Sequence, residues 1–205
     1  MVNFMKLNNL INRIKQINPN IKFVGEFDDN NKKTGYWEFY YENGNLHKKG
    51  IYLNDLREGN WIFYYDNGII ECKGIYLNGL KDGYWEEYWD NGDLETKGNY
   101  INGLRNGYWE EYYYNGTLYS KGYYLNGIQD GYWEEYRENG NLYSKGNYIN
   151  GKRTGYWEQY WYNGNIRSKG NYLNGYIDGY WEYYHHNGLL KSKGNYITGE
   201  YYEFK

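Results

Sequence analysis

The sequence predicts an all-β protein: an elongated, curved, single-layer antiparallel sheet of seven 24-residue β-hairpin repeats with a short N-terminal capping helix. A glycine recurs every 24 residues from Gly35 to Gly179, with a tryptophan two residues after each. A fixed period of this size indicates a repeat architecture. The composition of 32 Tyr, 28 Gly and 9 Trp beside a single Pro supports the same class, because aromatic side chains favour strands and glycine suits turns.

The N-terminal segment, residues 1–20, has the spacing of an amphipathic helix. Its apolar residues, among them Phe4, Leu7, Leu10 and Ile14, fall on one helical face, and Pro19 ends the pattern. Because the first strand of an array exposes unpaired backbone groups, we expect this helix to cap that edge. The alternative is a docking helix for a partner or a membrane surface.

The remaining chain divides into strands in order. Residues 21–34 resemble half of a repeat and predict a lead-in strand, and residues 203–205 are the expected C-terminal end of the last strand. The seven repeats between them span residues 35–58, 59–82, 83–106, 107–130, 131–154, 155–178 and 179–202.

Each repeat carries two turn signals, which are Asn115-Gly116 and Asn126-Gly127 in the fourth repeat. Asn-Gly is the strongest short-range signal for a two-residue type I′ turn, because both residues tolerate a positive φ. We therefore expect a two-residue turn at both places.

Counting outward from the first turn gives the register of the hairpin. Trp109 falls opposite Gly122, and Glu110 falls opposite Lys121. The count predicts an ion pair between these Glu and Lys positions in six of the seven hairpins, and a tryptophan ring over a glycine in all seven.

The same count assigns side chains to the two faces of the sheet. The Glu face carries Tyr, Glu and Lys, and we expect it to be solvated. The Trp face is the expected packed face, and it carries the tryptophans, a Tyr column and a column of Leu46, Ile70, Leu94, Leu118, Leu142, Ile166 and Leu190.

The pattern G-Y-W-E-x-Y-x-x-N-G-x-L-x-x-K-G-x-Y-x-N-G, seen from Gly131 to Gly151, resembles the MORN repeat. In particular it resembles the bacterial MORN variant of YwqK-type, antitoxin-like proteins, over residues 35 to about 199. The resemblance implies hairpin repeats in a long curved sheet. It further implies a scaffold for protein partners or, in some members, association with phospholipid membranes. The antitoxin-like label implies a partner toxin.

Composition and motifs disfavour several other classes of protein. The formal net charge of −3, with both signs interspersed, gives no basic stripe for nucleic acid. No phosphate loop, HExxH motif or cysteine pair occurs, so we expect no catalytic residues, metal site or cofactor, and not an enzyme. No apolar run approaches a transmembrane segment or the core of a signal peptide, and we expect a cytoplasmic protein.

The Trp face is the candidate binding surface, because two of its positions vary among repeats while the frame stays constant. Tyr, Trp and Arg also dominate interface energetics. The predicted function is a non-enzymatic scaffold that binds a protein partner. The alternative is a module for carbohydrate, choline or phospholipid. The predicted binding residues are Trp37, Trp61, Trp85, Trp89, Trp109, Trp133, Arg137, Trp157, Trp161, Trp181, Tyr41, Tyr65 and Tyr113.

Overall fold

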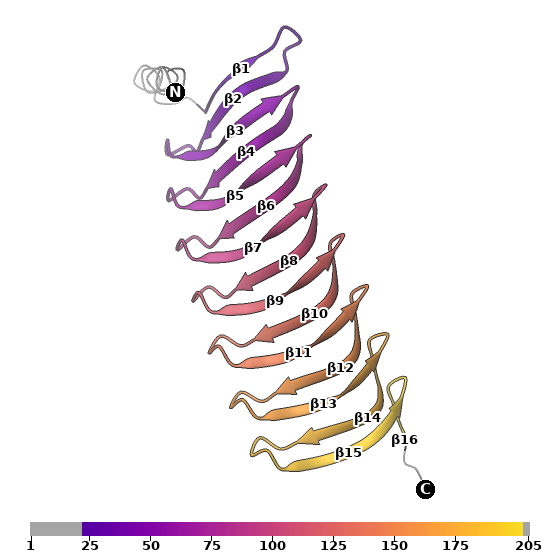
Figure 1. Ribbon diagram of the computed structural model, residues 1–205. Coiled ribbons are helices and arrows are strands. Elements are labelled where there is room, and N and C mark those ends of the chain that lie inside the picture. The colour runs from indigo at the N-terminus through magenta and orange to yellow at the C-terminus, as the bar shows by residue number, and fades with distance from the viewer. Residues whose placement is uncertain (1–21, 203–205) are drawn as a thin grey trace. The chain divides into compact units, whose positions relative to one another are not determined.

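The computed structural model describes residues 22–202, and this part of the chain contains sixteen strands and no helix (Figure 1). The chain forms two compact units, Met1–Gly92 and Asp93–Lys205. The predicted capping helix lies outside the described residues. The strands of unit 1 are β1 (Phe23–Phe27), β2 (Lys33–Tyr40), β3 (Leu46–Leu53), β4 (Leu56–Tyr64), β5 (Ile70–Leu77) and β6 (Leu80–Tyr88). Those of unit 2 are β7 (Leu94–Ile101), β8 (Leu104–Tyr112), β9 (Leu118–Leu125), β10 (Ile128–Tyr136), β11 (Leu142–Ile149), β12 (Lys152–Tyr160), β13 (Ile166–Leu173), β14 (Tyr176–Tyr184), β15 (Leu190–Ile197) and β16 (Glu200–Tyr202).

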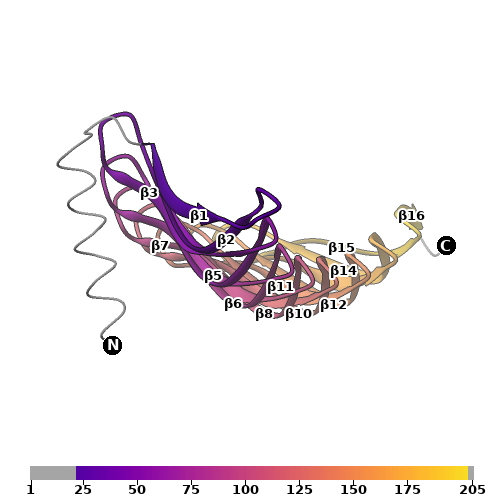
Figure 2. The same ribbon diagram turned by 90° about the horizontal axis from the view of Figure 1, so that it is seen from above.

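Within each unit the strands pair antiparallel with their neighbours in the chain. Each unit is one layer thick, because none of the described residues forms a helix or second sheet over either face (Figures 1 and 2). Figure 2 also shows that individual strands are curved. These findings confirm the prediction of an all-β, antiparallel sheet of repeated hairpins.

The second turn of the repeat is the predicted two-residue turn. Asn126 and Gly127 both have positive φ, 51° and 81°, and Leu125 is paired with Ile128 across them. Positive φ at both central residues defines the type I′ turn, whose twist matches that of the flanking strands.

The prediction for the first turn is wrong. Only Gly116 has a positive φ there, 79°. The Gly116 N–H donates to the carbonyl of Tyr113 over 2.9 Å, and the Tyr113 N–H donates to the carbonyl of Thr117 over 2.8 Å. The Asn115 side chain accepts from the Thr117 N–H over 2.9 Å. This is a tight turn closed by a left-handed glycine, followed by a bulge, rather than a type I′ turn.

The bulge restores the predicted register but moves the leucine column. The register shifts between Glu111 and Tyr112, where Leu118 is the partner of Tyr112. Beyond this shift Trp109 faces Gly122 as predicted. Because one extra residue reverses the alternation of side chains, Leu118 shares the face of Tyr112, which is the Glu face. The placement of the Leu and Ile column on the Trp face is therefore wrong.

Each tryptophan ring lies over the glycine of the preceding repeat rather than the one in its own hairpin. A Cβ atom on Gly122 would be 2.3 Å from the Trp133 ring. At this place the register shifts, and the Trp133 Nε1–H donates to the carbonyl of Tyr123 over 3.0 Å. The same contact joins Gly25 to Trp37, Gly50 to Trp61, Gly74 to Trp85, Gly98 to Trp109, Gly146 to Trp157 and Gly170 to Trp181.

These rings form the core of a sheet that has no second layer. The Tyr124 and Trp133 rings meet edge to face at 5.0 Å and 88°, and Tyr148 and Trp157 meet at 5.1 Å and 87°. Burying an aromatic side chain removes roughly 200 Å² from water. At about 25 cal/mol/Å², each ring contributes at most about 5 kcal/mol. The tryptophans and the tyrosines between them thus provide most of the burial.

Gly122→Ala is expected to lower the free energy of unfolding by about 3 kcal/mol, because the new methyl group must displace a buried indole. The matched control is Gly116→Ala, at a positive φ where a Cβ meets nothing within 4 Å. We expect this control to cost only about 1 kcal/mol. Urea unfolding followed by circular dichroism measures both. Equal costs would show that the tryptophan contact is not the constraint at Gly122.

Candidate functional site

The structure places the repeated tryptophans beneath other side chains of the Trp face. The exposed fraction is 0–1% for Trp37, Trp61, Trp85, Trp109, Trp133, Trp157 and Trp181. A partner on this face would therefore contact the side chains that cover these rings.

The side chains over five of these rings include a cation that the sequence did not lead us to predict. A basic residue stands four positions before the tryptophan in five of the seven repeats, and this spacing was the available signal. Contacts of this kind between a cation and a ring face contribute about 0.5–2 kcal/mol. The cation lies above the tryptophan ring of its own strand at 5.6 Å for Lys33, 5.2 Å for Arg57, and 4.3 Å for Lys81, Arg105 and Arg153.

In the third and fourth repeats, a glutamate on the same face neutralises the cation. Lys81 Nζ lies 2.6 Å from Glu87 Oε1, and Arg105 forms an ion pair with Glu111. Glu111 also accepts a hydrogen bond from the Ser120 hydroxyl over 2.9 Å. The positive charge above Trp85 and Trp109 is thus balanced within strands β6 and β8.

The first two repeats lack this balance, because phenylalanine occupies the glutamate position in both. Lys33, Lys48 and Arg57 form what we term the cationic patch, and no carboxylate in residues 22–202 forms an ion pair with any of them. Lys48 Nζ lies 4.9 Å above the ring of Phe39, and Arg57 lies 5.2 Å above that of Phe63. Burial, followed by the charges of Arg57 and Lys33, lowers the pKa of Lys48.

The variable edge of the Trp face lies beside the first turn. Tyr113 Oη donates to the carbonyl of Tyr136 over 2.9 Å, Arg137 Nη2 to Tyr160 over 2.9 Å, and Trp161 Nε1 to Tyr184 over 3.0 Å. Tyr41 and Tyr65 make the same bond to the following repeat, over 2.7 Å each. The side chains of these predicted binding residues therefore also join neighbouring repeats, by donating to backbone carbonyls of the following repeat.

The bulge brings a second set of varied residues to this edge. His47 packs on Tyr41 with ring centres 4.4 Å apart, and Tyr119 packs on Tyr113 at 5.0 Å. Strict alternation without a bulge places these residues on the Glu face, so they were not predicted as part of the candidate surface. Their variation among repeats was the signal that could have identified them.

The Glu face carries a repeated hydrogen-bond network. Glu110 Oε2 accepts from the Tyr112 hydroxyl over 2.6 Å and lies 2.6 Å from Lys97 Nζ, and Glu110 Oε1 accepts from Tyr108 over 3.3 Å. The predicted ion pair was with Lys121 of the same hairpin. The glutamate instead pairs with the lysine of the preceding repeat, and Lys121 pairs with Glu134 over 2.7 Å.

The single cysteine, Cys72, is partly buried and forms no disulfide. Burial raises the pKa of the Cys72 thiol to about 12, so this thiol is protonated at neutral pH. No group of three or more His, Cys, Asp and Glu side chains in residues 22–202 is arranged to hold a metal ion. In the same range no helix has the length and apolar character needed to span a membrane.

Comparison with known proteins identifies the repeat. The profile of the family described as MORN repeat variant matches residues 33–54, 57–78, 81–102, 105–126, 129–150, 153–174 and 177–198. No curated protein matches the chain. Among solved structures, the chain resembles the crystal structures of TcdB2-TccC3-Cdc42 and TcdB2-TccC3, with 12% and 13% identity and a TM-score of 0.17 for each. These alignments cover 87% and 84% of this chain but 14% of each matched chain.

Acidification is expected to destabilise the sheet through its Glu face. At Glu110, partial burial acts to raise the pKa, but hydrogen bonds from Lys97 and Tyr112 outweigh it and hold the pKa below its usual range. A carboxyl whose pKa is lowered by folding stabilises the protein above its unfolded pKa of about 4.3, and this contribution is lost as pH falls through the folded value. The urea midpoint should therefore drop below about pH 4.3.

Glu110→Gln is expected to flatten this acid dependence, since it removes one of the titrating groups. The control, Glu138→Gln, removes an exposed carboxylate near a turn and is expected to follow the wild-type curve. An unchanged pH profile in Glu110→Gln would contradict the role of the network.

Proposed function

Because the chain belongs to the MORN repeat variant family, its hairpins form a repeat scaffold, and we propose that this scaffold is non-enzymatic and binds an acidic segment of a protein partner at the cationic patch. The observation that carries the proposal is that Lys33, Lys48 and Arg57 lie on aromatic rings with no carboxylate partner in the described range. Glu87 supplies that partner for Lys81 within strand β6. The carboxylates of the bound segment take this role in the first two repeats.

The aromatic rings of the patch favour a peptide over a simple anion. Phe39 and Phe63 are partly exposed and lie beside the cations, so acidic and apolar side chains of one extended segment both find contacts. Successive repeats are two strands apart, roughly 9.6 Å, a distance that an extended segment covers in about three residues. The faces of the rings that could enclose choline already carry the chain's own cations.

An antitoxin-like role is the more specific form of this proposal, with a toxin as the partner that carries the acidic segment. Its support is the resemblance of the repeats. The proposed setting is the cytoplasm, so the partner is sought in a cytoplasmic extract. Anionic phospholipid shares the charge of the segment and is tested separately.

The test variant is Lys48→Ser with Arg57→Gln, two side chains that other repeats carry at the same positions, as at Ser120 and Gln129. A partner retained by the wild-type protein is identified, purified and titrated by calorimetry. Removing charges that pair with the partner is expected to weaken binding at least tenfold. Phe63→Glu, which supplies an internal carboxylate beside Arg57, is expected to weaken it as well.

Arg153→Gln is the matched control, because it removes the corresponding cation above Trp157 but lies outside the patch. We expect it to bind like the wild type, and thermal unfolding confirms that every variant is folded. Equal loss in the control and the patch variant would contradict the proposal. Sedimentation with phosphatidylserine vesicles, lost in the patch variant while no protein partner is bound, would favour a lipid surface instead.

A further inference from the structure

The second repeat departs from the others on the Glu face as well. Tyrosine and glutamate occupy two positions of the network in each of the other repeats, as Tyr108 and Glu110 do in the fourth. The second repeat has Asn60 and Ile62 there. The second repeat therefore lacks the phenol ring and the carboxylate that the other six repeats have at these positions.

The lysine of this network is nevertheless in place. Lys49 Nζ lies 5.8 Å from the Tyr64 ring, close to the 5.6 Å between Lys97 Nζ and the Tyr112 ring in the complete network. Lys49 is paired in register with Ile62, where the third repeat has Glu86 opposite Lys73 at 2.8 Å. No carboxylate in residues 22–202 forms an ion pair with Lys49.

The one carboxylate that lies opposite Lys49 in the strand pairing accepts hydrogen bonds from two tyrosines instead. Glu38 lies opposite Lys49 in the first hairpin. Its carboxylate accepts hydrogen bonds from the hydroxyl groups of Tyr36, over 3.0 Å, and Tyr40. Glu38 forms no ion pair with Lys49, so Lys49 lacks the carboxylate partner that Glu86 provides for Lys73.

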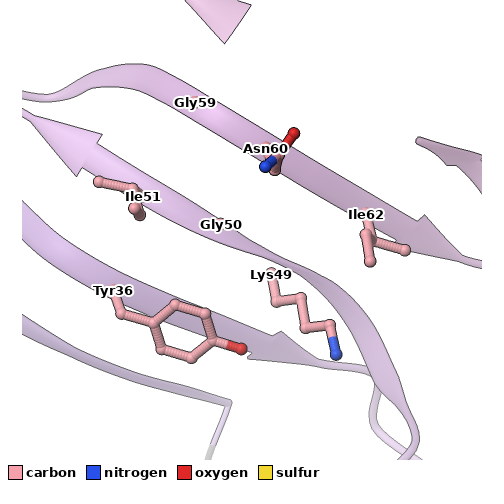
Figure 3. Close-up of a pocket in the computed structure, with 7 residues that line it drawn as sticks. All are labelled: Tyr36, Lys49, Gly50, Ile51, Gly59, Asn60 and Ile62. Carbon is pink, nitrogen blue, oxygen red and sulfur yellow. The ribbon is translucent and has the colours of Figure 1, made fainter. Parts of the chain in front are cut away.

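A pocket of about 380 Å³ lies at this place (Figure 3). Its walls are the side chains of Tyr36, Lys49, Ile51, Asn60 and Ile62, and its floor includes the backbone of two glycines. Figure 3 shows Tyr36, Lys49 and Ile62 on adjacent strands around it. A pocket of this size holds a small ligand with one ring, and its isoleucines give it an apolar wall.

We propose that this pocket binds an aromatic carboxylate, whose ring fills the space of the missing tyrosine and whose carboxylate pairs with Lys49. The side-chain amide of Asn60 supplies a further hydrogen bond, and Ile51 and Ile62 contact the ring. The site lies opposite the cationic patch, since successive residues Lys48 and Lys49 point to different faces. It is therefore independent of the proposed protein partner.

Phenylpropanoate is the probe, titrated by calorimetry and by chemical shifts of the Lys49 and Ile62 amides. Wild type is expected to bind with a Kd below about 1 mM, and the neutral phenylpropanamide at least tenfold more weakly. An acetylated tetrapeptide ending in a free phenylalanine tests the second source of this chemistry. Tighter binding of the tetrapeptide would identify the ligand as a chain terminus.

Two variants test the cause of binding. Asn60→Tyr with Ile62→Glu restores the sequence of the other repeats, so we expect it to fold and to lose at least tenfold in affinity. Tyr108→Asn with Glu110→Ile reproduces the departure in the fourth repeat and is expected to add a second site. Absence of saturable binding by the wild type up to about 10 mM, or equal affinity in the restored variant, would overturn the proposal.

Discussion

The packing of each tryptophan ring on the glycine of the preceding repeat is the contact on which the rest of the structure depends. A sheet without a second layer has little means of burying side chains, because sheets normally pack against other elements. Here the missing Cβ of a glycine such as Gly122 lets the flat Trp133 ring lie against the backbone. The Trp133 indole N–H donates to the carbonyl of Tyr123, on the strand that holds Gly122, so the buried ring leaves no polar group unsatisfied.

Because the frame rests on these rings and on the turns, other positions are free to differ among repeats. The second repeat differs in sequence from the third and fourth repeats on both faces of the sheet. Phe63 leaves Arg57 without a glutamate on the Trp face, and Ile62 leaves Lys49 without one on the Glu face. The adjacent residues Ile62 and Phe63 of β4 thus leave unpaired cations on both faces of unit 1. The cationic patch lies on the Trp face, and the pocket beside Lys49 lies on the Glu face.

Periodicity and turn chemistry were sufficient to predict the hairpins and the pairing of Trp109 with Gly122. They could not predict the first turn, because Asn-Gly serves both turn types and the bulge that follows has no distinct sequence signal. The partner of Glu110 was also ambiguous, since a lysine lies opposite it on both sides. The cations above the tryptophan rings were not predicted, because the basic residue four positions before the tryptophan is replaced by Gln129 and Ile177 in two repeats and belongs to no known motif.

A double-mutant cycle between Gly122 and Trp133 tests the central contact most directly. Trp133→Ala alone is expected to cost about 3 kcal/mol or more, as for other large-to-small changes in a core. If the ring is what excludes a side chain at Gly122, adding Gly122→Ala to Trp133→Ala will cost less than about 1 kcal/mol, which gives a coupling of roughly 2 kcal/mol. An equal cost of Gly122→Ala in both backgrounds would contradict the account.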